Sequence, residues 1–173
     1  AHPVNHLTGV EAVLGDFFTP LRHAIPNVYR RDELFIGGQN VRENGGQWVA
    51  SLTHYVGRFE RDLFGVKASD RMVFLRSGEF YRLQNGQIAE AKIILDLPDL
   101  MRQAGRFPLP QMLGTEMLFP GPATHDGVLP SGPDGMVSLN IVQGMLGDLH
   151  VYNPDTNDSS GQTGTDGYWH DDM

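Results

Sequence analysis

The stretch GEFYRLQNGQIAE, residues 78–90, decides the fold. Its Asn85-Gly86 dipeptide favours a two-residue β-hairpin turn, because both residues tolerate the positive φ angles that such a turn requires. Residues 71–83 before the turn and residues 87–95 after it are the two strands that the turn joins. We therefore predict a long antiparallel hairpin at this point of the chain.

Further elements are predicted on the N-terminal side of this hairpin. Polar and apolar residues alternate over residues 47–56, which is typical of a strand, and the alternation puts Trp48, Leu52 and His54 on one face. The other predicted elements are a strand over residues 28–36 and a helix over residues 8–23 that begins at a Thr8/Glu11 capping box and ends or bends early at Pro20.

The segment after the hairpin begins with a helix signal. Asp96 directly follows the last strand, and an aspartate there can cap a helix over residues 97–104, which Gly105 ends. Residues 106–135 are rich in proline and glycine and are expected to be irregular. A further helix, capped by Ser138, is predicted to reach residue 152, and the polar stretch 153–167 reads as a flexible linker.

Composition excludes several classes of protein. A chain of 173 residues with 40% hydrophobic and 20% charged residues is expected to fold as a globular domain without a membrane span. Its net charge of −8, with no run of Lys or Arg, argues against nucleic acid or an anionic membrane as a partner. The absence of cysteine excludes disulfides and thiolate metal sites. No signal-peptide pattern opens the chain, so we expect a cytoplasmic protein.

Four segments, in order, resemble the SnoaL-like polyketide cyclases of the nuclear transport factor 2-like superfamily. The hairpin resembles that family's f-R-x-x-x-G-K-I-x-E pattern, and DLPDLMRQAG, residues 96–105, is similar to its D-x-x-x-L-L-x-Q-x-G ending. Residues 9–13, GVEAV, and the segment 54–66 resemble its first helix and its H-x-G-x-F-x-G-I strand and loop. The resemblance implies an α+β fold: a cone-like, curved antiparallel sheet packed on helices.

The resemblance also suggests a division of the chain. Residues 1–105 form a SnoaL-like domain that lacks the usual first helix, residues 106–137 an irregular tail, and residues 138–173 a helix and flexible linker that resemble the opening of a second such domain. Two interpretations stay open. Either the sequence is a piece of a tandem protein, or its last helix folds back and supplies the missing helix.

The activity that the resemblance implies is general acid–base chemistry without a metal or other cofactor. In such cyclases a carboxylate in an apolar cavity removes a proton next to a carbonyl group, and the enolate closes a ring by an intramolecular aldol reaction. We therefore expect a lyase or isomerase acting on a hydrophobic carbonyl compound, and a homodimer. The alternative is a non-catalytic module of the same fold that binds small molecules or dimerises.

Three residues are the catalytic candidates. Asp96 matches the family's acid–base aspartate, although a helix cap alone explains an aspartate there. His54 is a candidate because an imidazole ordinarily titrates near neutral pH, but a lone histidine on an apolar face is more often a hydrogen-bonded core residue. Glu79 stands where the family places a polar or imidazole side chain; if it faces water, it is an ordinary surface charge. Two carboxylates in one dry cavity would repel each other, and this would raise one pKa.

The substrate-binding candidates are Arg76, Lys92 and Trp48. Arg76 could bind an anionic group, although arginine and glutamate that alternate on a sheet are usually cross-strand pairs. Lys92 stands where the family often has tryptophan and would lower the pKa of a neighbouring carboxyl group. His170-Asp171-Asp172 carries metal-ligating side chains, but three adjacent residues do not normally converge on one ion, so no metal site is predicted.

Overall fold

The structure of the protein is a computed structural model that describes residues 1–40, 45–110, 121–127, 135–148, 152–153 and 158–159. The chain divides into two compact units, Ala1–Gly127 and Val128–Met173. The first unit contains the predicted hairpin and all six candidate residues. It is therefore the unit that positions the site.

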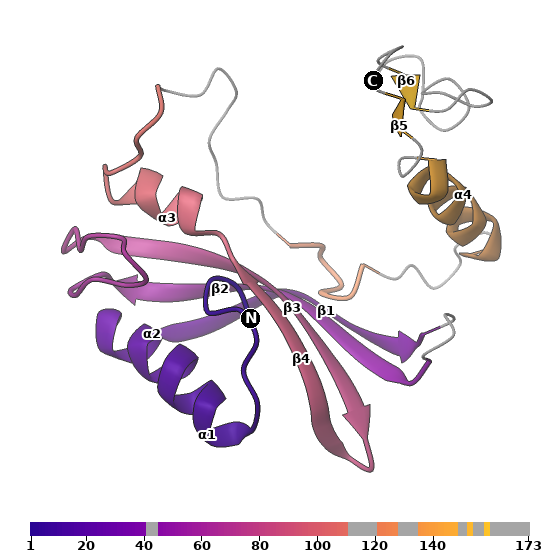
Figure 1. Cartoon of the computed structure of the whole chain (residues 1–173), viewed down its shortest axis with the longest axis horizontal. Coiled ribbons are helices and arrows are strands. Elements are labelled where there is room, and N and C mark those ends of the chain that lie inside the picture. Colours follow the sequence, from indigo (N-terminus) through magenta and orange to yellow (C-terminus); the bar gives the residue numbers. More distant parts are fainter. Residues whose placement is uncertain (41–44, 111–120, 128–134, 149–151, 154–157, 160–173) are drawn as a thin grey trace. The chain divides into compact units, whose positions relative to one another are not determined.

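A curved four-stranded antiparallel sheet forms the centre of the first unit (Figure 1). The strands lie side by side in the order of the sequence: β1 (Tyr29–Gln39), β2 (Gln47–Arg58), β3 (Met72–Gln84) and β4 (Gln87–Leu95). The predicted hairpin is confirmed, since Asn85 and Gly86 connect β3 to β4 with φ angles of 52° and 73°. Together with the helices below, this sheet confirms the predicted α+β class.

One helical segment lies against a face of this sheet and consists of α1 (Val10–Val13), the π-helical turn η1 (Leu14–Phe18) and α2 (Thr19–Ala24) (Figure 1). The predicted capping box is wrong: Gly9 is the N-cap residue, and no side chain caps the helix. Pro20 does not end the helix. Proline has no N–H group, so one backbone hydrogen bond of the helix is missing at this position. The π-helical turn η1 lies directly before α2, which contains Pro20.

The remaining elements are two helices and two short strands: α3 (Leu97–Gln103), α4 (Gly135–Asp148), β5 (Tyr152–Asn153) and β6 (Asp158–Ser159). The helix predicted after Asp96 is confirmed. The cap predicted at Ser138 is wrong, because α4 begins three residues earlier. Most of the predicted linker 153–167 lies outside the described residues. No helix in the described part of the chain is long and apolar enough to cross a membrane.

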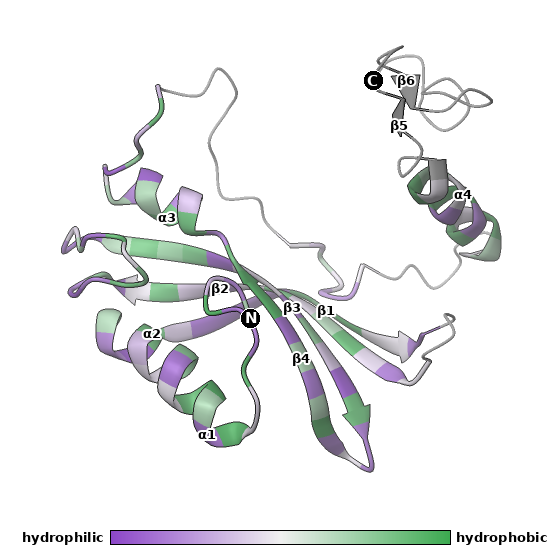
Figure 2. Cartoon of the chain, in the orientation of Figure 1, coloured by the Kyte–Doolittle hydropathy of each residue, from purple (hydrophilic) through white to green (hydrophobic). Residues whose placement is uncertain are grey.

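Hydrophilic and hydrophobic residues follow one another in bands along the strands (Figure 2). The sheet has two different faces, because successive side chains of a strand point to opposite sides. On the face covered by α1, η1 and α2, here called the helix face, Tyr55 of β2 lies opposite Leu75 of β3, and both are buried. Phe17 and Leu21 from the helical segment belong to the same core. We call the opposite side of the sheet the outer face.

Other segments of the chain form backbone hydrogen bonds with both edge strands of the sheet, β1 and β4. Along β4, the backbone N–H of His2 donates to the carbonyl oxygen of Ile93. Along β1, the N–H of Phe35 donates to the carbonyl oxygen of His125, in the described segment 121–127. These contacts satisfy backbone groups that an edge strand would otherwise present to solvent.

The contact between α2 and the sheet allows a first prediction. A Cβ atom at Gly57 on β2 would clash with Cγ2 of the buried Ile25, whereas one at Gly78 on β3 would meet nothing within 4 Å. Gly57→Ala is therefore expected to lower the free energy of unfolding by about 1–3 kcal/mol through overpacking, measured by urea denaturation. Gly78→Ala is the matched control and should leave it nearly unchanged. Equal effects of the two variants would contradict this packing of α2 on the helix face.

Candidate functional site

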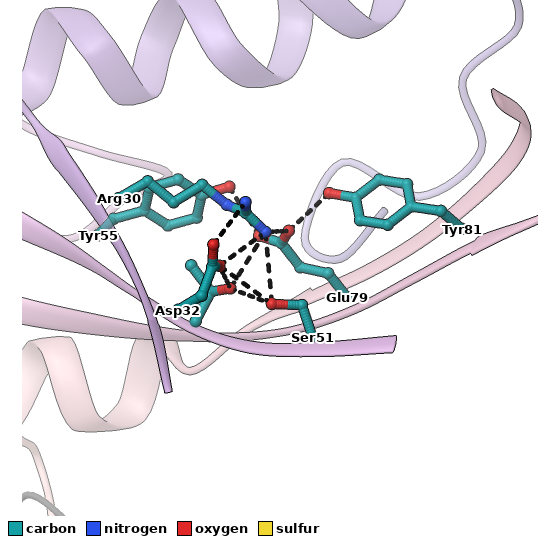
Figure 3. Close-up of polar contacts among 7 residues, drawn as sticks. Arg30, Asp32, Ser51, Tyr55, Glu79 and Tyr81 are labelled. Atoms are coloured by element: carbon teal, nitrogen blue, oxygen red, sulfur yellow. Dashed lines mark hydrogen bonds and ion pairs between the residues drawn. The ribbon is translucent and has the colours of Figure 1, made fainter. Parts of the chain in front are cut away.

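A fully buried carboxylate, Glu79 of β3, is the centre of a polar cluster on the helix face (Figure 3). The hydroxyl groups of Tyr55 and Tyr81 each donate a hydrogen bond of 2.6 Å to it, one to each carboxylate oxygen. The guanidinium of Arg30 donates from 2.9 Å and also forms an ion pair with it. Glu79 thus accepts three hydrogen bonds, one of them from a cation.

A second carboxylate, Asp32 of β1, lies beside this group. The hydroxyl groups of Ser51 and Thr53 donate to Asp32 Oδ1 over 3.1 and 2.7 Å, and Arg30 pairs with the same oxygen at 3.0 Å. The guanidinium is therefore shared between two carboxylates (Figure 3). With one guanidinium and two carboxylates, the cluster has a formal charge of −1.

The strand register explains why these residues meet. Ser51 of β2 pairs with Glu79 of β3, and Tyr55, four residues further along β2, points to the same face. On β1, Arg30 pairs with Tyr55, so its side chain also reaches the helix face. The cluster therefore joins three neighbouring strands and depends on their alignment.

The cluster reaches the surface at its β1 end. The side chains of Arg30 and Asp32 are 37% and 36% exposed, whereas that of Glu79 is not exposed at all. Tyr81, on the other side of Glu79, is partly buried. A molecule approaching from solvent would therefore meet the guanidinium before it met the buried carboxylate.

The surroundings fix the charge states of the donors. Burial, and then the neighbouring Glu79 carboxylate, raise the pKa of Tyr55 and of Tyr81 far above the ordinary value, so both phenols stay protonated donors. For Arg30, burial lowers the pKa, but the charges of Glu79 and Asp32 outweigh burial, and the net shift is upward. The donors to Glu79 are thus two neutral phenols and one permanent cation.

Asp96 lies elsewhere, at the start of α3. Its side chain accepts a hydrogen bond of 3.1 Å from the backbone N–H of Asp99, as an N-cap does. It also pairs with Arg76 at 3.1 Å, and both side chains are 34% exposed. The structure brings Asp96 together with Arg76, but with neither Glu79 nor Lys92.

His54 is buried on the outer face, with Trp48 and Leu52, as the predicted alternation of this strand requires. Its Nδ1 lies 3.2 Å from Oε1 of Glu33, a buried carboxylate at a register shift in β1. Burial lowers the pKa of His54, and the hydrogen bond to Glu33 only partly offsets this. These contacts are those of a hydrogen-bonded core histidine.

The three substrate-binding candidates also point to the outer face. Arg76 is opposite His54 in the register and pairs with Asp96. Lys92 lies 3.6 Å from Glu90, and its ammonium group is 5.3 Å from the centre of the Trp48 ring. Of the six candidates, Glu79 alone therefore lies on the helix face. Among the residues that the structure describes, no three His, Asp or Glu side chains lie close enough together to hold a metal ion.

Sequence analysis missed the partners of Glu79. Tyr81 is two residues from Glu79 on the same strand, so strand alternation could have found it. Tyr55 lies on the face of β2 opposite to His54. It could have been found only by first deciding which face of β2 is buried. Arg30 is 49 residues from Glu79, and only the register of three strands brings the two together.

The comparisons with known proteins identify the family. The fold is that of an α+β protein with helices on a curved, unclosed antiparallel sheet, and the family model of the SnoaL-like polyketide cyclases matches residues 2–104. The chain belongs to this family, and the predicted resemblance is confirmed. A comparison with curated proteins finds no significant match.

Two solved structures are similar to this chain. AclR, a proposed hydroxylase from Streptomyces galilaeus, is 15% identical, with a TM-score of 0.46 over 58% of this chain and 70% of that one. A proposed SnoaL-like polyketide cyclase from Jannaschia sp. CCS1 is 23% identical, with a TM-score of 0.43 over 58% of this chain and 64% of that one.

The contacts of Asp96 allow a second prediction. Asp96→Ala removes the cap of α3 and should lower the free energy of unfolding by about 1 kcal/mol in urea denaturation. Asp96→Asn keeps a capping oxygen and loses only a partly exposed ion pair, so its cost should be about 0.5 kcal/mol or less. If the two variants cost the same, the cap is not what Asp96 contributes to stability.

Proposed function

We propose that this SnoaL-like chain is a cofactor-free enzyme in which Glu79 removes a proton from the carbon next to a carbonyl group of a hydrophobic small molecule. The observation that supports this most is the buried carboxylate held between two phenol hydroxyls and a guanidinium. A base for such a reaction needs a water-poor position, and a developing enolate oxygen needs hydrogen-bond donors close by. The cluster offers both.

In this proposal Arg30 and Tyr81 bind the substrate oxygen. The carbonyl group of the substrate binds to the exposed part of Arg30, and this new contact weakens the ion pair between Arg30 and Glu79. Glu79 Oε2 then has a lone pair available to accept the proton from carbon. As the proton moves from carbon to Glu79, the negative charge moves to the substrate oxygen, where the guanidinium and the Tyr81 hydroxyl stabilise it.

The reaction can close in two ways, and neither needs a cofactor. If the enolate carbon attacks a second carbonyl in the same molecule, a carbon–carbon bond forms and the new alkoxide takes the proton back from Glu79. If the proton returns instead to a different atom of the same substrate, the product is an isomer. In both cases the product has the composition of the substrate, and Glu79 is regenerated.

The predicted acid–base roles of Asp96 and His54 remain predictions. Both residues lie on the outer face, and our proposal assigns the proton transfer to Glu79 instead. The predicted homodimer and cytoplasmic location also remain proposals. A hydrophobic small molecule is the partner that the proposed chemistry requires.

A second candidate function is supported by how completely Glu79 is bonded. Both carboxylate oxygens of Glu79 already accept hydrogen bonds, and the side chain is not exposed, so a ligand has no direct access to the carboxylate. On this basis the helix face would bind a carbonyl ligand through Arg30 without converting it. The two candidates differ in one observable, the exchange of the ligand's α-protons.

The test follows α-proton exchange directly and does not need the natural substrate. The chain is incubated with 1-tetralone, a hydrophobic ketone, in D₂O, and loss of the C2 proton signal is followed by NMR. Glu79→Gln should slow the protein-dependent exchange by about 100-fold or more, and Tyr81→Phe by about 10-fold, because each removes a group that acts in the transition state. Thermal unfolding of both variants checks that they remain folded.

Glu90→Gln is the matched control. Glu90 lies on the neighbouring strand β4, pairs with Arg82 and Lys92, and is partly exposed on the outer face. Its replacement should leave the exchange rate unchanged. Exchange that persists in folded Glu79→Gln would contradict the proposal, and binding of the ketone without exchange in the unsubstituted chain would favour the binding module.

A further inference from the structure

A hollow of about 580 Å³ lies on the outer face, on the side of the sheet opposite to Glu79. One row of paired residues crosses all four strands beneath it: Ile36, Ala50, Phe80 and Lys92. The adjacent row contributes Gly38 and Trp48. The volume is within the range of roughly 300–1,000 Å³ that is typical of small-molecule sites.

Glycine at position 38 leaves the space above Trp48 open. Gly38 of β1 pairs with Trp48 of β2, and a Cβ atom at Gly38 would meet nothing within 4 Å. A larger residue would therefore project over the tryptophan without a clash. The floor of the hollow is apolar and accessible, since Phe80 is 45% exposed and Ile36 is 39% exposed.

The charges at the β4 side of the hollow favour an anion. Lys92 and Arg82 carry two positive charges, and the one carboxylate that pairs with both is Glu90, at 3.6 and 3.1 Å. This group of three has a formal charge of +1 in a chain with a net charge of −8. The side chain of Lys92 is 64% exposed, and its ammonium group stands over the Trp48 ring, 5.3 Å from the ring centre.

We propose that this outer-face hollow binds a small, flat aromatic anion, such as an aromatic carboxylate. The ring of the ligand stacks on the exposed Phe80 and on the part of Trp48 that Lys92 does not cover, in the space that Gly38 leaves free, and its anionic group pairs with Lys92. The hollow lies on the other face of the sheet from Glu79. The proposal is therefore independent of the proton transfer proposed above.

The probe is 2-naphthoate, with the uncharged 2-naphthylmethanol as its partner of similar shape, and binding to the full chain is measured by isothermal titration calorimetry. Lys92→Gln should weaken binding of 2-naphthoate by about 3- to 5-fold and that of the alcohol less than about 2-fold, since an exposed ion pair contributes up to about 1 kcal/mol. Gly38→Leu should abolish binding of both. Lys67→Gln is the matched control at an exposed lysine that pairs with Asp62, and it should change neither affinity.

Three results would overturn the proposal. The first is no binding of 2-naphthoate by the unsubstituted chain. The second is loss of binding in Glu79→Gln with normal binding in Gly38→Leu, which would place the ligand on the helix face. The third is a dimer in analytical ultracentrifugation that Gly38→Leu converts to a monomer while 2-naphthoate does not bind, which would mean that a second copy of the chain occupies the hollow.

Discussion

The ion pair between Arg30 and the buried Glu79 is the interaction on which this site depends. A carboxylate removed from water costs several kcal/mol unless charged or polar donors replace its hydration. Arg30, Tyr55 and Tyr81 supply these donors from all three of the strands β1, β2 and β3. A slip of one residue in the register of any of these strands would point its contribution to the wrong face. The buried charge therefore disfavours every alignment except the observed one.

The alternation of side chains along the strands separates two kinds of chemistry. The helix face holds a negatively charged cluster against an apolar core, and the outer face holds a small positive group beside an open aromatic surface. Asp96 stabilises the start of α3, where its carboxylate binds a backbone N–H and Arg76. One sheet can thus carry both of the proposed sites, because adjacent residues of a regular strand point to opposite faces.

Local features of the sequence predicted much of the fold. Asn85-Gly86 specifies the hairpin because its turn needs residues that tolerate positive φ, and Asp96 marks α3 because a capping carboxylate acts over three residues. Each of these two signals depends on residues that are only a few positions apart in the sequence. The start of the first helix at Gly9 was not predictable in this way, since the available capping side chain is not used. The partners of Glu79 were also missed, because Arg30 reaches it only through the pairing of distant strands.

A double-mutant cycle between Arg30 and Glu79, measured by urea denaturation, tests the central claim most directly. The variants are Arg30→Met, Glu79→Gln and the two combined, and Arg30→Met with Glu90→Gln is the control pair. We expect the free energy changes of the first pair to fall short of additivity by about 1–3 kcal/mol, because Arg30→Met leaves the buried Glu79 carboxylate without its counter-charge, and this cost is absent once Glu79 is glutamine. The control pair should be additive. Additive effects in both cycles would contradict the account, since the buried carboxylate would then not depend on Arg30.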